Sequence, residues 1–169
     1  MESKLVPVAG MPEVGRLHIR GPNIMLGYVR ATNPGAIERL PGGWHDTGDI
    51  VDIDSEGFIK ILGRVKRFAK IGGEMVSLAV VENCAAAVWP DHLHAAVTLP
   101  DPKKGEQVVL LSEAPDAART PILTWAQSHG VPEISVPRRV FKVSQIPVLG
   151  TGKVDYGAVR TEAERLMND

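Results

Sequence analysis

The sequence predicts an α+β protein in two parts: a β-rich segment over residues 1–65, then a small α+β domain over residues 66–169. Three observations support this prediction. Strand-like patterns with turn formers between them fill the first third of the chain. From about Lys66, helical and strand-like segments alternate. The chain has 169 residues, 44% of them hydrophobic, which is enough to build a core and too many for a disordered tail.

Strands account for the first part. Leu17 and Ile19 alternate with polar neighbours, which is the period of a half-buried strand. Further strand-like runs occupy residues 2–8, 50–53 and 58–62. The last two flank a short segment that contains Gly57, so we expect a hairpin there. Residues 33–35 and 41–43 are rich in proline and glycine, and we expect loops at both places.

Helices and strands alternate in the second part. Ser77 is expected to cap the first helix and Asp155 the last one. Thr120, followed by Pro121, matches an N-cap with proline at the first helical position, so it is expected to begin the middle helix. Strand-like runs occupy residues 93–99, 108–111 and 140–143. This order predicts a small sheet covered by helices.

Composition excludes several classes of protein. Nineteen basic and twenty acidic residues give a net charge of −1, which argues against a nucleic-acid partner. The single cysteine, Cys84, cannot form an intramolecular disulfide and favours a reducing, cytoplasmic environment. No apolar run reaches the roughly 18–20 residues that span a bilayer. His92 and His94 have no third ligand nearby in sequence, so we predict no metal site.

Residues 42–49 form the first of three segments that are rich in glycine and charge. Asp49 follows a Thr-Gly pair at the predicted mouth of a strand. A carboxylate in that position can accept hydrogen bonds from a diol such as a ribose. A capped turn before a hairpin explains the same residues, and spacing alone leaves both interpretations open.

Residues 63–74 form the second segment. Four cations lie within seven residues, where the strand pattern gives way to the α+β pattern. A basic linker beside the paired Gly72 and Gly73 can contact an anionic ligand or act as a hinge. A solvated hairpin with a Gly-Gly turn is the alternative.

Residues 147–153 form the third segment and place Lys153 on a Gly-Thr-Gly loop. A lysine in such a loop suits the neutralisation of a phosphate or a carboxylate. The segment is not a Walker phosphate loop, because Pro147 stands where that loop needs glycine and Val154 where it needs Ser or Thr.

Taken together in this order, the three segments resemble the late motifs of the adenylate-forming superfamily of acyl-CoA synthetases, peptide-synthetase adenylation domains and luciferases. Thr47, Gly48 and Asp49 match its T-G-D motif, and Arg16 stands at a usual glutamate of its earlier G-E-L motif. Residues 63–82 match its G-R…K-x-x-G…E stretch, and residues 147–153 its terminal P-x-x-x-x-G-K. The resemblance covers essentially the whole chain. It implies that residues 1–65 end the large domain, as part of a distorted β-barrel, and that residues 66–169 form the mobile lid.

Three strings, at residues 21–28, 70–78 and 99–107, are similar to acyl-acyl carrier protein synthetases, which are often fused behind a 2-acylglycerophosphoethanolamine acyltransferase. This resemblance implies that ATP and Mg²⁺ activate a fatty acid as an acyl-adenylate. The phosphopantetheine thiol of acyl carrier protein then takes the acyl group. The sequence leaves open coenzyme A as the acceptor, a non-catalytic binding module on the same fold, and attachment of the full-length protein to the inner membrane.

The same resemblance implies roles for individual residues. Asp49 would bind the ribose hydroxyls beside Arg64, and Lys153 would bridge the substrate carboxylate and the α-phosphate. Lys66 would be the hinge about which the lid rotates between the two half-reactions. The rotation would remove Lys153 and bring the hairpin of Gly72 and Gly73 to the pantetheine tunnel.

No segment resembles the family's phosphate loop, adenine pocket or acyl pocket. We therefore expect that these residues alone neither adenylate a fatty acid nor bind ATP tightly. An unpaired sheet edge in the first part would let two chains pair, so we also expect some dimerisation that is not physiological.

Overall fold

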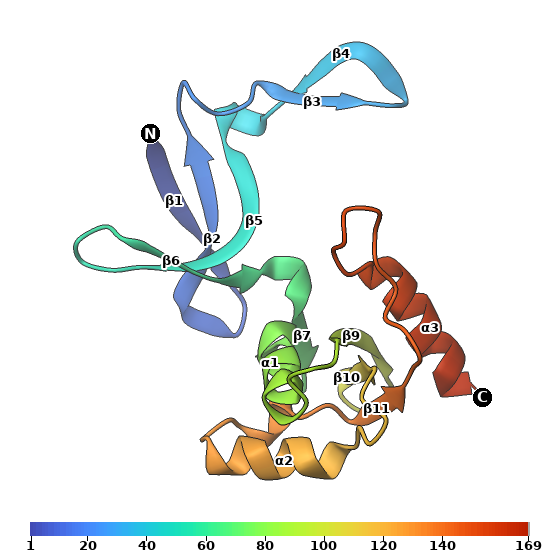
Figure 1. The fold of residues 1–169 in the computed structure, drawn as a ribbon. Coiled ribbons are helices and arrows are strands. Elements are labelled where there is room, and N and C mark those ends of the chain that lie inside the picture. Colours follow the sequence, from blue (N-terminus) through green and yellow to red (C-terminus); the bar gives the residue numbers. More distant parts are fainter. Residues whose placement is uncertain (169) are drawn as a thin grey trace. The chain divides into compact units, whose positions relative to one another are not determined.

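A computed structural model describes residues 1–168 of the chain, which fall into two compact units (Figure 1). The first unit is Met1–Lys66 and the second begins at Arg67. Strands make up the first unit, and strands with three α-helices make up the second. The predicted α+β class is therefore confirmed.

The main sheet of the first unit has four antiparallel strands in the order β1-β2-β5-β6. They are β1 (Glu2–Val8), β2 (Met11–Arg20), β5 (His45–Ile53) and β6 (Ile59–Arg64). Leu17, Ile50 and Val51 are its buried apolar residues. The predicted hairpin joins β5 to β6, and Gly57 in its loop has a φ of +88°. The sheet is open within residues 1–66, with β1 and β6 as its edges, and the dimerisation that we predict from such an edge stays a prediction.

A separate two-stranded hairpin corrects one prediction. It consists of β3 (Gly27–Arg30) and β4 (Asn33–Arg39), so the expected loop over residues 33–35 was wrong. Pro34 is tolerated because β4 pairs on one side only. Gly27 is required by the close pairing, since a Cβ there would lie 2.1 Å from the carbonyl oxygen of Glu38. Residues 41–43 form the short 3₁₀ turn η1 (Pro41–Gly43).

The second unit is built around β10. Its strands are β7 (Phe68–Ile71), β8 (Glu74–Ser77), β9 (His94–Asp101), β10 (Gly105–Ser112) and β11 (Arg139–Lys142). Its helices are α1 (Leu78–Val88), α2 (Arg119–Ser128) and α3 (Tyr156–Asn168), with a 3₁₀ turn η3 (Glu133–Ser135). Strand β10 pairs antiparallel with β9 and parallel with β11, and it meets β7 through Gly105 and Ile71.

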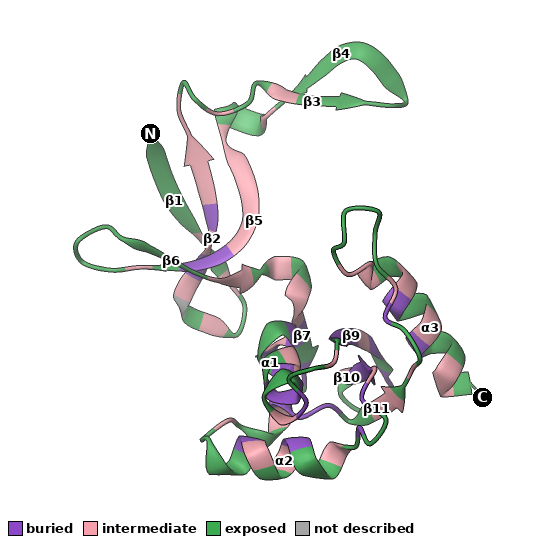
Figure 2. Ribbon diagram, viewed as in Figure 1, coloured by how far each residue is buried: buried purple, intermediate pink, exposed green. Residues whose placement is uncertain are grey.

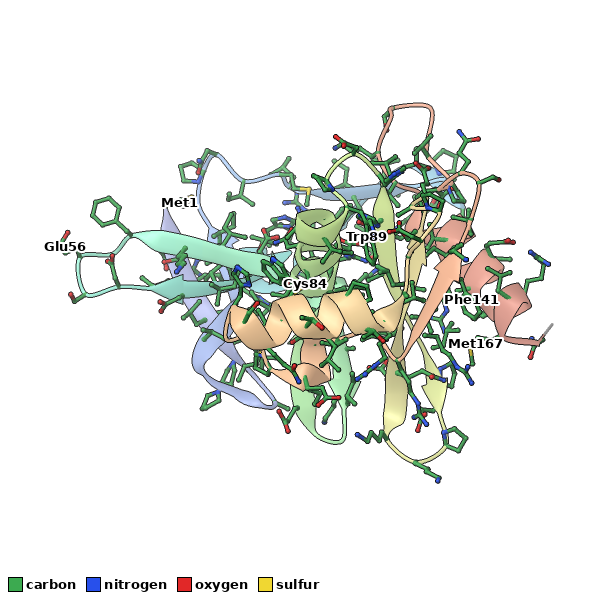
Figure 3. The ribbon with its side chains drawn as sticks, turned by 60° about the horizontal axis from the view of Figure 1, so that its bottom comes forward. Met1, Glu56, Cys84, Trp89, Phe141 and Met167 are labelled. Carbon is green, nitrogen blue, oxygen red and sulfur yellow. The ribbon has the colours of Figure 1, made fainter. Side chains whose placement is uncertain are left out.

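Alternation along β9 and β10 builds a core on each face of this sheet. Ala96, Val108 and Leu110 pack with residues of α1 and α2. Ala95, Val97, Val109 and Leu111 pack with Ile146 and residues of α3. Both faces are covered, so most of β9 and the part of β10 from Val108 to Ser112 are buried (Figure 2). Figure 3 labels Cys84 and Trp89 from the first core and Phe141 and Met167, which pack against the second. Cys84 is buried, as predicted.

Two of the three predicted cap positions are correct. Asp155 accepts hydrogen bonds from the backbone N–H groups of Gly157 and Ala158 at 3.0 and 3.1 Å, so it caps α3 as predicted. Ser77 occupies the N-cap position of α1, as predicted, but its side chain makes no capping bond. Thr120 lies inside α2, which begins one residue earlier at Arg119. Pro121 is therefore the third helical residue and not the first, which is tolerated because the N–H that proline lacks would have no partner in the first turn.

Asp101 ties the β9–β10 turn to the segment before β11. Its side chain is only 6% exposed. Oδ1 accepts backbone N–H bonds from Lys103 and Lys104, both at 2.9 Å, and Oδ2 accepts from Arg138 Nη1 at 2.5 Å. The bonds from the Lys104 and Lys103 backbone, with the Arg138 charge beside them, hold the pKa of Asp101 below its ordinary value of 3.8.

Asp101→Asn is therefore expected to destabilise the protein at neutral pH and progressively less in acid. A depressed folded-state pKa gives a contribution that is complete above the ordinary value of 3.8 and is lost as the pH falls through the folded-state pKa. Urea unfolding of both proteins at a series of pH values checks this, with exposed Asp91→Asn as the control. A difference in stability that stays the same from pH 7 down into that acid range would contradict the assignment.

No helix among residues 1–168 is both long enough and apolar enough to cross a lipid bilayer.

Candidate functional site

Thr47, Gly48 and Asp49 lie within β5, at a bulge, and not at the mouth of a strand as we predicted. The pairing register between β2 and β5 shifts opposite Leu17, and Gly48 takes a φ of +74°. The Thr47 hydroxyl donates to the Leu17 carbonyl at 3.0 Å and accepts from the Asp49 N–H at 3.1 Å. The Gly48 N–H donates to Asp46 Oδ1 at 3.0 Å. A bulge redirects the side chain that follows it, which here is Asp49.

Asp49 faces Arg64 across the β5–β6 pair. Arg64 Nε lies 2.7 Å from Asp49 Oδ1, and Arg64 Nη1 donates to the Thr47 carbonyl at 3.1 Å. The Asp49 side chain is 16% exposed and that of Arg64 is 66% exposed. No described residue donates a hydrogen bond to Asp49 Oδ2, so that oxygen can still accept one from a hydroxyl. The structure thus brings two predicted residues together, and their roles toward a ribose stay predictions.

Asp46 is a part of this site that sequence reasoning missed. Arg16 Nε donates to Asp46 Oδ1 at 2.7 Å, and His18 Nε2 lies 3.7 Å from the same oxygen. Burial, and then the positive charges of Arg16 and Lys4, lower the pKa of His18. Arg16 thus orients Asp46, whose Oδ1 accepts the hydrogen bond from the Gly48 N–H at the bulge. The available signal was Arg16 itself, which replaces the usual glutamate of the resembled motif.

The basic run of residues 64–70 is not one free patch. Arg64 is paired with Asp49 and Arg67 with Glu82. Lys66 is exposed, within the 3₁₀ turn η2 (Val65–Arg67), and is the last residue of the first unit. A hinge at Lys66 stays a prediction.

Gly72 and Gly73 make the turn of the β7–β8 hairpin, so the alternative of a hairpin with a Gly-Gly turn describes this segment correctly. Their φ values are +60° and +99°, which only glycine adopts readily and which a two-residue hairpin turn of this kind requires. The Gly72 N–H also donates to the Lys104 carbonyl at 3.1 Å. This contact anchors the hairpin to the β9–β10 turn, while its role toward a pantetheine stays a prediction.

Lys153 ends a tight turn that leads into α3. Val148 and Val154 form a β-bridge on either side of the turn. The Leu149 N–H donates to the Lys153 carbonyl at 2.7 Å, and the Gly152 N–H to the Leu149 carbonyl at 2.8 Å. The Lys153 side chain is exposed and makes no hydrogen bond or ion pair with any other described residue. The Lys153 ammonium group is therefore carried by a hydrogen-bonded turn and has no partner among the described residues.

No group of three His, Cys, Asp or Glu side chains that could hold a metal ion is found among the described residues. His94 is buried, and its ring nitrogens lie 2.9 Å from Ser112 Oγ and 3.0 Å from the Trp89 carbonyl.

Comparison with known proteins gives sequence and structural matches, although no family model matches the chain. Over 152 residues the chain is 35% identical to 2,3-dihydroxybenzoate-AMP ligase of Bacillus subtilis (strain 168), covering 88% of this chain and 28% of that protein. The structure of an amide bond synthetase from Marinactinospora thermotolerans matches with a TM-score of 0.71 and 31% identity, over 95% of this chain and 34% of that one. Mycobacterium tuberculosis fatty acyl CoA synthetase matches with a TM-score of 0.60 and 28% identity, over 89% and 30%. The chain thus spans 28–34% of the length of these proteins.

Proposed function

We propose that this chain, whose homologues and structural neighbours are adenylate-forming ligases, is the C-terminal part of an ATP-dependent enzyme that joins a carboxylic acid to a thiol. One observation carries the proposal. The same chain contains Asp49, which follows a β-bulge and pairs with Arg64, and Lys153, whose side chain has no partner among the described residues and lies on a hydrogen-bonded turn. Because the chain spans only 28% of the Bacillus ligase, the activity belongs to a longer polypeptide that contains these residues.

In the first half-reaction, a carboxylate oxygen attacks the α-phosphorus of ATP and pyrophosphate leaves. Asp49 Oδ2 accepts a hydrogen bond from a ribose hydroxyl. Arg64 Nε lies 2.7 Å from Asp49 Oδ1 and so fixes the orientation of the carboxylate. Lys153 places its ammonium between the two anions that must approach each other, which lowers their repulsion as charge builds up. In the second half-reaction, a thiol attacks the acyl carbon and AMP leaves. For that step we assign Lys66 as the hinge that withdraws Lys153 and delivers Gly72 and Gly73.

Within this class, we propose a fatty acid as the acid and the phosphopantetheine thiol of acyl carrier protein as the acceptor. The strings at residues 21–28, 70–78 and 99–107 support this choice. Coenzyme A is the alternative acceptor. The single cysteine supports a cytoplasmic location. An acyltransferase ahead of the synthetase belongs to the same proposal.

The test supplies the complete polypeptide with ATP, Mg²⁺ and a fatty acid or, in a parallel assay, an aromatic acid, and with either holo-acyl carrier protein or coenzyme A. We expect release of AMP and an acyl thioester on the holo-carrier protein, with the apo-carrier protein as the control that lacks the thiol. A thioester on coenzyme A alone would replace the acceptor that we propose. No adenylate with either fatty or aromatic acids would overturn the proposal and leave a non-catalytic module. Residues 1–169 alone should show no ATP–pyrophosphate exchange, and exchange by them would overturn their assignment as a partial catalyst.

A further inference from the structure

Three side chains from distant parts of the sequence form a half-buried group in the second unit: Arg67, Glu82 and Tyr156, here called the Arg67 cluster. Arg67 Nη2 lies 2.7 Å from Glu82 Oε1, and both side chains are 18% exposed. Arg67 Nη1 donates to the Ala96 carbonyl at 2.8 Å. The guanidinium also lies over the Tyr156 ring, 3.8 Å from its centroid. The guanidinium is thus held by a charge, a carbonyl and an aromatic face.

Glu82 is the centre of the Arg67 cluster. Its Oε1 accepts the Ala96 N–H at 2.8 Å and the Tyr156 hydroxyl at 3.2 Å, in addition to the Arg67 contact. Burial, followed by the Glu82 charge, raises the pKa of Tyr156. Helix α1, strand β9 and helix α3 are therefore joined at one carboxylate. Breaking such a partly buried pair leaves a charge without compensation.

The Arg67 cluster connects the residue after Lys66 with the turn that carries Lys153, and the proposed function requires a fixed spacing between these two places. Arg67 is the first residue of the second unit and directly follows Lys66. Tyr156 is the first residue of α3, three positions after Lys153. The intervening Asp155 donates its N–H to the Pro147 carbonyl at 2.9 Å, which closes the base of the Lys153 turn. A chain of fixed contacts thus runs from the residue after the predicted hinge to the turn that carries Lys153.

We propose that Arg67, Glu82 and Tyr156 are positioning residues, which hold the Lys153 turn at a fixed place relative to the residue that follows the hinge. This inference rests on the proposed function. A rotating lid delivers its lysine accurately only if the segment between the hinge and the lysine is stiff. Misplacement of a reacting group by about 1 Å can cost roughly 100-fold in rate, so a loose turn would slow adenylate formation.

Tyr156→Leu tests the far end of the Arg67 cluster. Leucine keeps an apolar side chain against the second core, with which Tyr156 packs, but removes the ring over Arg67 and the bond to Glu82. Tyr156→Phe restores the ring alone and is the conservative rescue. Met167→Ala is the matched control, because Met167 packs on the same core from the other end of α3 and is outside the cluster.

The first readout is amide hydrogen exchange of residues 148–158 in the 169-residue chain. Tyr156→Leu should speed exchange in this segment at least fivefold, Tyr156→Phe should restore most of the protection, and Met167→Ala should leave the segment unchanged. Equal exchange in Tyr156→Leu and the unaltered chain would overturn the proposal. This measurement needs no catalysis, so it decides the mechanical claim even if the complete protein forms no adenylate and the proposed function fails.

The second readout separates positioning from a general loss of stability. In the complete protein, Tyr156→Leu should lower adenylate formation at least tenfold. It should leave thioester formation from preformed acyl-adenylate within about threefold, because that step uses Gly72 and Gly73 on the β7–β8 hairpin, to which Tyr156 does not belong. Tyr156→Phe should recover most of the adenylation rate. Equal loss in both half-reactions would show a merely structural role and overturn the proposal.

Discussion

Lys153→Ala, made in the complete protein, is expected to reduce the rate of adenylate formation by roughly 10²–10³-fold, the usual cost of removing one group that stabilises developing charge. Thioester formation from preformed acyl-adenylate should survive, because the motion that we propose about Lys66 withdraws the lysine in that half-reaction. The measurements are ATP–pyrophosphate exchange for the first step and release of AMP on addition of the thiol for the second.

The surroundings of Lys153 indicate that this substitution removes the ammonium group with little effect on stability. Its side chain is exposed and makes no hydrogen bond or ion pair with the rest of residues 1–168, and the turn is held by backbone bonds that alanine retains. The free energy of unfolding should therefore change by less than about 0.5 kcal/mol. Lys142→Ala removes another exposed cation from the same unit and is the control. Equal loss of both half-reactions in Lys153→Ala would contradict the assigned role.

The fold was predictable where short-range pattern and final environment agree. The alternation around Leu17 and the apolar run that contains Ile50 predicted strands correctly, because their apolar side chains are the ones that the sheet buries. Strand β4 was not predictable, since Pro34 and Gly35 are strong local turn signals and only pairing with β3 overrides them. Thr120 failed as a cap because proline is tolerated anywhere in the first turn of a helix, so Pro121 does not fix the position of the N-cap.

In the candidate site, too, the local turns were predictable and the contacts between residues distant in sequence were not. The Lys153 turn and the turn of Gly72 and Gly73 are local structures, and glycine spacing was enough to suggest them. The Arg16–Asp46 pair spans 30 positions and depends on a register shift that no local pattern reveals. The contact between Glu82 and Tyr156 spans 74 positions and exists only once α1 and α3 are placed on opposite faces of one sheet. The basic run that contains Arg67 was noted as a linker, but the sequence did not single out Arg67 or indicate its partners.

Asp49→Ala is expected to raise the KM for ATP by roughly 10- to 100-fold in the complete protein and to leave the KM for the acid nearly unchanged. A hydrogen bond to a charged group contributes about 1.5–3 kcal/mol, and each 1.4 kcal/mol is tenfold in affinity. Asp49→Asn keeps a neutral acceptor and should show a smaller effect. Steady-state kinetics with ATP and the acid varied separately measure both constants.

The geometry of the Asp49–Arg64 pair indicates that a higher KM for ATP in Asp49→Ala would report weaker nucleotide binding and not unfolding. Arg64 is 66% exposed, so removing its partner leaves a solvated cation, and an ion pair of this kind contributes little to stability. The Thr47 and Asp46 bonds that shape the bulge involve the Asp49 and Gly48 backbone and remain in the alanine variant. Exposed Asp52→Ala, on the same strand, removes a carboxylate away from the bulge and is the matched control. If Asp49→Ala raised both KM values equally, or if Asp52→Ala raised the KM for ATP as much, the ribose-binding role would be wrong.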